Sequence, residues 1–246
     1  QVSFSNDDSF EWFGGSVNSR HIIAFKGTDD DFDTDNGYSG LNQYGIALRD
    51  SDYYDLTYSL SSGSSTSEAF ESDNEATGTA AVSPYTNAVF SNFTLVGPVP
   101  VGTKYSELNS TAKSAFRRGA RIRRNSSLRV VNSIFMGYRN FVMVDGDSSL
   151  RNTNYDGILP FVTPNTAVDQ KTKQLFFTNN LIVNTNAAFT SATDTTANGL
   201  VEVARGSKSG DKLNALDSWI RQSSPLAPNL IPVGFSTGTV LVNPIA

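Results

Sequence analysis

Acidic residues in the first third of the chain have the types and spacing of a site for a hard cation. On a β-strand, alternation would direct Asp31, Asp33 and Asp35 to one face, about 7 Å apart, with Phe32 pointing inward. Neighbouring carboxylates repel one another, and a ligand set made only of oxygen favours Ca²⁺ over a transition metal. The run is not an EF-hand, because its Gly comes one position late and Asn42 stands where the bidentate Glu would be. We therefore expect Ca²⁺ here; the alternative is that the acids are solvated turn residues.

Basic residues gather in the middle of the chain, where seven of the 19 fall between positions 113 and 129. Strand alternation there would bury Ala120 and Ile122 and present Arg121 and Arg123 outward. Guanidinium groups bind carboxylates and sulfates through a planar fork, so Arg118, Arg121 and Arg123 are candidate ligands for an acidic polysaccharide. The alternative is that they pair with acids of neighbouring strands. No nucleic-acid partner is expected, because the net charge is -5 and no aromatic residues interleave with the basic run.

The absence of Cys and the single His exclude several kinds of site. No disulfide, thiolate metal site, cysteine nucleophile or multi-histidine metal site can be built. A triad of nucleophile, His and acid would have to use His21, which as a lone His is expected to lie on the surface or be held by its neighbours. No catalytic residue is assigned. Residues 1–80 hold 15 of the 24 acids and three of the 19 bases, a division that favours a cation in one region and an anionic partner in the other.

Short strands with repeated motifs must position these groups. Abundant Ser, Thr, Asn, Asp and Gly, with sparse Lys and Glu, favour strands and turns over helices. An Asn followed, after one residue, by three apolar or β-branched residues recurs at Asn92, Asn132 and Asn179, with spacings of 40 and 47 residues. A Phe followed by a carboxylate recurs at Phe10, Phe32 and Phe70, the first two 22 residues apart.

A unit near 22 residues, or about twice that with loop insertions, is typical of a parallel β-solenoid. Its coils stack about 4.8 Å apart and align equivalent residues in ladders. Such stacking would bring Glu11, Asp33 and Glu71 into one ladder. The expected Ca²⁺ ligands are therefore Glu11, Asp31, Asp33, Asp35, Glu71 and Asp73, with Asp7, Asp8, Asp29 and Asp30 close by. The alternative fold is a β-sandwich whose strands share only β-propensity and Asn turns.

The acidic third also resembles a known family. The segments 2–15, 24–25, 29–40 and 70–74 resemble secreted or surface-attached proteins of Bacteroidetes-type bacteria, which are similar to the pectate-lyase-like right-handed parallel β-helices. The likeness covers residues 2–144 and is strongest over 2–75. It implies an exported right-handed parallel β-helix with further coils before residue 2, so that the first coil would be covered by those coils or by a partner chain. The catalytic residues of pectate lyases do not map onto this sequence, so no lyase activity is implied.

Together these patterns predict an all-β protein with a single β-helix domain over residues 1–246. A short flanking helix is expected over 211–222, from an apolar stripe that ends before Pro225, and an extended tail over 225–246. No run is long and apolar enough for a membrane span. The expected location is extracellular or on the outer-membrane surface.

The expected function is that of a Ca²⁺-stabilised, non-catalytic β-helix that recognises glycans or serves as a surface scaffold. Two alternatives stay open: a polysaccharide lyase or hydrolase acting on an acidic glycan, and an accessory subunit of an outer-membrane assembly.

Overall fold

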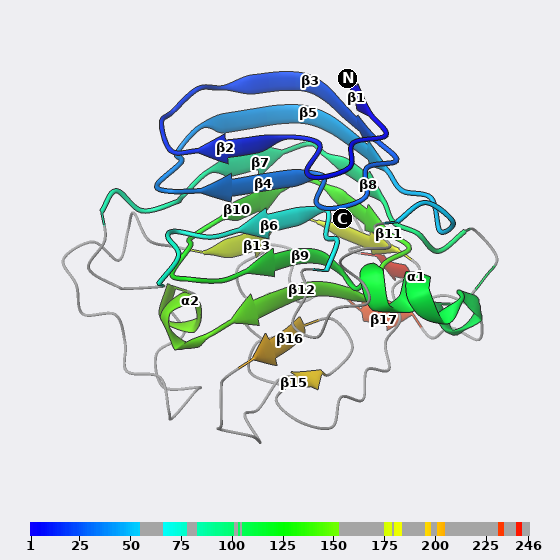
Figure 1. Cartoon of the computed structure of the whole chain (residues 1–246). Coiled ribbons are helices and arrows are strands. Elements are labelled where there is room, and N and C mark those ends of the chain that lie inside the picture. The colour runs from blue at the N-terminus through cyan, green and yellow to red at the C-terminus, as the bar shows by residue number, and fades with distance from the viewer. Residues whose placement is uncertain are drawn as a thin grey trace.

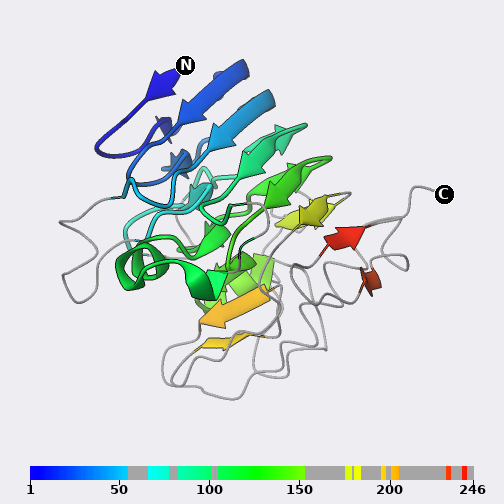
Figure 2. The same ribbon diagram turned by 90° about the vertical axis from the view of Figure 1, so that its right-hand side faces the viewer.

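The chain winds into a parallel β-helix with two sheets, sheet A and sheet B (Figure 1). This computed structural model describes residues 1–54, 66–77, 83–100, 103, 105–152, 175–178, 180–183, 195–197, 201–204, 231–233 and 240–242. Figure 2 shows the coils from the side, with successive strands of sheet A stacked from the N-terminus downward.

Along the chain, one or two strands of sheet A are followed by one or two strands of sheet B. Sheet A contains β1 (Val2–Ser3), β3 (Ser19–Phe25), β5 (Leu41–Leu48), β7 (Val89–Ser91), β8 (Thr94–Val96), β10 (Arg129–Val131), β11 (Ile134–Met136), β13 (Phe176–Thr178), β14 (Leu181–Val183), β17 (Ile231–Val233) and β18 (Val240–Val242). Sheet B contains β2 (Glu11–Phe13), β4 (Phe32–Asp35), β6 (Phe70–Ser72), β9 (Arg118–Ile122), β12 (Asn140–Asp145), β15 (Thr195–Ala197) and β16 (Val201–Ala204). The helical elements are short: η1 (Tyr105–Glu107), α1 (Ser110–Ala115) and α2 (Asp147–Asn152).

Strand pairing within each sheet is parallel along most of the stack. Every pair from β1 to β14 in sheet A is parallel, as is every pair from β2 through β12 to β16 in sheet B. Among the strands that the structure describes, the antiparallel pairs are β14–β18, β17–β18 and β15–β16. Parallel neighbours one coil apart confirm the predicted β-helix and exclude the β-sandwich, whose sheets are antiparallel.

A ladder of bends divides the strands of sheet A. His21, Tyr44, Asn92 and Asn132 occupy equivalent places in successive coils, and all have positive φ, between 52° and 62°. In the coils of β7–β8 and β10–β11 this bend separates two strands. Asn tolerates this left-handed conformation better than most residues, which explains the repeat at a spacing of 40. Asn179 lies outside the described residues, although Leu181 pairs with Ile134 as the spacing of 47 predicts.

The core is a stack of aromatic rings between the sheets. The three Phe that precede carboxylates lie one above another, with ring centroids 5.7 Å apart for Phe10 and Phe32 and 5.5 Å apart for Phe32 and Phe70. Phe32 and Phe70 are fully buried, as are Phe90 of β7 and Phe93 of the bend before β8, which pack against them. Burial of each such side chain contributes about 1.5–3 kcal/mol, so the stack fixes which face of each strand points inward.

Parts of the predicted C-terminal region lie outside the description. The helix expected over 211–222 falls on residues that the structure does not describe. In the expected tail, 225–246, the structure describes only 231–233 and 240–242, both of which are strands. None of the described helices is long and apolar enough to span a membrane.

Candidate metal centre

Sheet B carries charged side chains on its outer face in two columns. The register places Glu11, Asp33, Glu71 and Arg121 in one column, as predicted for its three acids. The neighbouring column, one alternate residue further along each strand, contains Phe13, Asp35, Asp73, Arg123 and Asp145. Acidic coils therefore stack directly on a basic coil.

A third row of acids lies at the start of these strands, where the chain turns into sheet B. The Asp8 carboxylate accepts a hydrogen bond from the Asp30 backbone N–H (2.9 Å), and the Asp30 carboxylate accepts one from the Glu68 N–H (2.5 Å). Each acid thus holds the backbone of the next coil. Glu68 is held in turn by Arg118, whose Nη1 lies 2.8 Å from Oε1.

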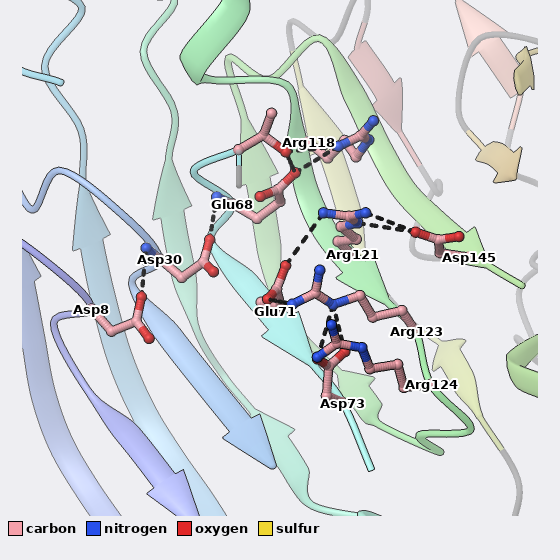
Figure 3. Close-up of polar contacts among 11 residues, drawn as sticks. Asp8, Asp30, Glu68, Glu71, Asp73, Arg118, Arg121, Arg123, Arg124 and Asp145 are labelled. Carbon is pink, nitrogen blue, oxygen red and sulfur yellow. Dashed lines mark hydrogen bonds and ion pairs between the residues drawn. The ribbon is translucent and has the colours of Figure 1, made fainter. Parts of the chain in front are cut away.

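Three buried carboxylates meet between these rows. Asp30, Glu68 and Glu71 each offer an oxygen within 4.8 Å of the others, and all three residues are buried. We call them the buried triad. In Figure 3 the side chain of Asp30 approaches those of Glu68 and Glu71, which both belong to the next coil.

Two oxygens of the buried triad have no hydrogen-bond partner among the described residues. They are Glu68 Oε2 and Glu71 Oε1, and the latter lies 3.7 Å from Arg121 Nη1. A buried anionic oxygen without a partner is costly, and a bound cation is one way to satisfy it.

The electrostatics of the buried triad also favour a cation. Burial raises the pKa of Asp30 well above its ordinary value, and the negative charges of Glu71 and Glu68 raise it further. Burial likewise raises the pKa of Glu71 to about 8, although Arg123 acts in the opposite direction. A divalent cation would reverse these shifts by favouring the ionised forms.

A second group of acids lies nearer the surface. Asp8, Glu11 and Asp33 approach within 4.8 Å of one another, and Asp7, Asp8 and Asp29 form an overlapping group. Burial and the negative charge of Glu71 raise the pKa of Asp33 to about 9. Burial raises the pKa of Asp8 to about 7.

Asp31 does not lie on the acidic face, so its predicted place beside Asp33 and Asp35 is wrong. Strand β4 begins at Phe32, and Asp31 in the preceding bend is not subject to strand alternation. Its side chain is fully buried, with Oδ2 2.9 Å from the Arg49 Nε. Asp31 is therefore part of an internal ion pair.

Two other predicted ligands belong to none of the close groups of acids among the described residues. Asp35 accepts a hydrogen bond from the Asn36 N–H (2.6 Å). Asp73 accepts from Arg123 Nε and from Arg124 Nη1, both at 2.7 Å. The structure therefore brings together Glu11 with Asp33, and places Glu71 in the buried triad.

The three candidate arginines all pair with acids of adjacent coils. Arg118 is buried against Glu68, Arg121 lies 2.8 Å from Asp145, and Arg123 contacts both Glu71 and Asp73. This is the alternative that the sequence left open. Arg121 and Arg123 keep about a fifth of their side-chain surface exposed, whereas Arg118 is too buried to contact a ligand at the surface.

The Ca²⁺ ligands predicted from the sequence do not include Glu68, and Asp30 is predicted only to lie close to them. The signal was available: Asp8, Asp30 and Glu68 all precede a repeated Phe by two residues. The full repeat is therefore an acid, any residue, Phe and a second acid. The first acid turns inward toward the next coil and the second lies on the outer face.

The donor set suits a hard cation. Carboxylate oxygens are ligands that Ca²⁺ prefers, and Ca²⁺ takes six to eight oxygens, which three acids can supply only in part. Backbone carbonyls or water would complete the shell. No nitrogen or sulfur ligand lies in any of the acidic groups.

Comparison with known proteins agrees with this architecture. A family model described as a pectate-lyase-like β-helix domain matches residues 1–219, well beyond the resemblance seen over residues 2–144. No curated protein and no solved structure matches the chain. Because the family model covers most of the sequence and the strands form a parallel β-helix, the chain belongs to the family of pectate-lyase-like β-helix domains.

Proposed function

We propose that the chain is a Ca²⁺-stabilised, non-catalytic β-helix of the cell exterior, where it serves as a scaffold or recognises glycans. One observation carries the metal part of this proposal: Asp30, Glu68 and Glu71 bring carboxylate oxygens within 4.8 Å of one another in the protein interior, where Glu68 Oε2 and Glu71 Oε1 accept no hydrogen bond from the described residues. A cation here would join the coil of β4 to the coil of β6 through side chains that otherwise repel.

Binding of the cation would stabilise the folded chain only. The ligands come from the bend before β4 and from the segment around β6, which come together only when the coils stack. A ligand bound only by the folded state adds about 2.7 kcal/mol at a concentration 100 times its Kd. Removal of Ca²⁺ should therefore lower the melting temperature by several degrees.

Thermal melts with Ca²⁺ and with EDTA test this directly. The wild type should melt several degrees lower in EDTA, and Glu68→Gln should lose most of that difference because it removes one ligand charge. Asp52→Asn is the matched control, since Asp52 lies in an exposed turn, belongs to none of the three acidic groups and should respond like the wild type. An unchanged wild-type melt after thorough chelation would count against a structural cation.

Glycan recognition rests on the partly exposed arginines of sheet B. Arg121 pairs with acids of both neighbouring coils and Arg123 with acids of the preceding coil, and each guanidinium group stays partly exposed. An acidic polysaccharide could exchange for part of that pairing. Affinity electrophoresis through uronic polysaccharides should retard the wild type more than the Arg121→Ala/Arg123→Ala variant. Equal migration would argue for a scaffold alone.

The enzymatic alternative is tested with the same polysaccharides. The proposal predicts binding without cleavage in the presence of Ca²⁺, as read by the absorbance of unsaturated products and by new reducing ends. Turnover that is lost in Asp33→Asn would instead assign the chain to the lyases or hydrolases.

A further inference from the structure

The parts of sheet A that follow the bend are apolar along their whole length. They read Ile-Ile-Ala-Phe in β3, Ile-Ala-Leu in β5, Thr-Leu-Val in β8, Ile-Phe-Met in β11 and Leu-Ile-Val in β14. Strand β4 of sheet B instead alternates, as Phe-Asp-Thr-Asp. Continuous apolar runs are typical of parallel strands that are covered on both faces, whereas alternation is typical of a sheet with one face in water. Sheet A therefore has the sequence of a sheet that packs against something on its outer face.

The register arranges the outward side chains of these strands in two columns. One column contains Ile23, Ile46, Thr94, Ile134 and Leu181, and the other contains Phe25, Leu48, Val96 and Met136. The residues between the two columns are fully buried in the core: Ala24, Ala47, Leu95 and Phe135. Strand alternation therefore directs the column residues outward, and none of them is buried. We call these nine residues the apolar strip.

The charge on this face is the opposite of the charge on sheet B. Strands β3, β5, β7, β8, β10 and β11 contain no acid, although the chain as a whole has a net charge of -5. Their charged residues are Arg20 and Arg129. Arg20 is exposed and lies three residues before Ile23, on the other side of the bend. The face therefore suits a partner that offers apolar and acidic side chains.

The apolar strip has the dimensions of one helix. Neighbouring strands lie about 4.8 Å apart and alternate residues about 7 Å apart, so the strip is about 19 Å long with its columns about 7 Å apart. An α-helix of about 13 residues has this length, and its turns, about 5.4 Å apart, nearly match the spacing of the coils. Such a strip covers roughly 200 Å², whereas a standard interface between folded proteins buries about 800 Å² of each partner. A single helix therefore fits the strip better than a second copy of the chain.

We propose that the apolar strip binds an amphipathic helix of a partner protein, with the helix lying across the stacked strands of sheet A (Figure 2). Apolar side chains three and four residues apart on the helix pack between the two columns, in the way that helices cover parallel sheets. Acidic residues on one flank of the helix pair with Arg20 and set its orientation. This inference depends neither on the cation at the buried triad nor on glycan binding at sheet B.

A synthetic peptide of about 14 residues, with Leu along one face and Glu on the flanks, serves as the probe. A side-chain lactam holds it helical, because so short a helix is marginal in water. Fluorescence anisotropy of the labelled peptide should show saturable binding to the full chain. The double variant Ile46→Ser/Ile134→Ser should bind at least about tenfold more weakly, because it removes two apolar side chains from the strip and none from the core. Val17→Ser is the matched control, since Val17 is 62% exposed but lies outside the strip.

A charge reversal tests the orientation and the location of the helix. Arg20→Glu should weaken binding of the acidic peptide, and a peptide with Lys in place of Glu should bind this variant more tightly than it binds the wild type. Photocross-links from the peptide should fall on β5, β8 and β11.

Four results would overturn the proposal. They are the absence of saturable binding, equal binding of a peptide whose Leu residues are scrambled off one face, wild-type affinity of the double variant, and cross-links to sheet B. A dimer of the chain alone that the double variant abolishes would assign the strip to a second copy instead. Sedimentation with phosphatidylglycerol vesicles that the double variant loses would assign it to a lipid surface.

Discussion

Asp31 and Asp33 stand two residues apart, and their surroundings give them opposite roles. Asp31 is neutralised by Arg49, which also donates to the Gly27 and Glu68 carbonyls and so ties the acid to the next coil. Asp33 faces only other acids at close range, and one of its oxygens is buried without a partner among the described residues. Burial raises the pKa of Asp31 to about 6, against the opposing effect of Arg49, and raises the pKa of Asp33 to about 9. At pH 7 Asp31 is therefore ionised beside its arginine, whereas Asp33 keeps its proton unless a cation is bound.

This difference predicts an unusual pH dependence in EDTA. The pKa of Asp33 is raised to about 9 in the folded chain, from an ordinary value near 3.8. Between these values the folded state keeps a proton that the unfolded state releases, so stability should fall as pH rises from about 4 to about 9. The slope for one such carboxyl is at most about 1.4 kcal/mol per pH unit.

Urea unfolding at pH 5, 7 and 9 measures this effect. Asp33→Asn should flatten the profile and be more stable than the wild type at pH 9, since it removes a charge that has no counter-ion. Asp52→Asn should follow the wild type. A wild-type midpoint that rises with pH would contradict the assignment.

At the scale of elements, the fold depends on how each coil passes its bends. The ladder of His21, Tyr44, Asn92 and Asn132 holds four non-glycine residues in the left-handed conformation at the same place in successive coils. In the first two coils the bend residues are rings, and His21 stacks on Tyr44 at 5.3 Å. Stacking of the two rings offsets part of the free energy that positive φ costs a residue with a bulky side chain. The next two coils have Asn at this position, and Asn adopts positive φ at a lower cost.

Substitution of Asn132 tests this account. Asn132→Ala should lower the free energy of unfolding by about 1 kcal/mol, because Ala pays more for positive φ, while Asn132→Gly should be nearly neutral. Chemical denaturation of both variants gives the comparison. If the Gly variant lost as much stability as the Ala variant, the side chain of Asn132 rather than its backbone conformation would be responsible.

At the scale of the molecule, the stack distributes charge and stability along its axis. Acids dominate the first coils and arginines the fourth strand of sheet B, and ion pairs join these regions across neighbouring coils. An interior strand pairs with two neighbours, but among the described residues β2 pairs in sheet B only with β4. Stability in solenoids is a sum over neighbouring units, so in a protein of residues 1–246 alone β2 should open more easily than strands paired on both sides.

Hydrogen exchange followed by mass spectrometry tests the gradient. Backbone amides of β2 should exchange at least about tenfold faster than those of β6, which lies between β4 and β9. Uniform protection of β2 and β6 would show that the coils open together rather than from the end.

The sequence by itself determined the fold class, the repeat and the column of acids on the outer face of sheet B. Each coil needs an aromatic ring in the core and a residue that tolerates positive φ at the bend, and the Phe and Asn repeats meet these two needs. The spacing of the Phe repeat predicted the register of Glu11, Asp33 and Glu71. Such local constraints recur wherever a coil recurs, which makes them visible in one chain.

Tertiary structure alone decided which acids and bases meet. The insertions between coils vary in length, so the sequence did not show that Arg123 would contact Glu71 and Asp73 or that Glu68 would turn toward Asp30. The direction of the Asp31 side chain could not be predicted from strand alternation, because β4 begins one residue later. In the structure that side chain contacts Arg49. Pairing of charges depends on distances across coils, and those distances exist only after the coils have stacked.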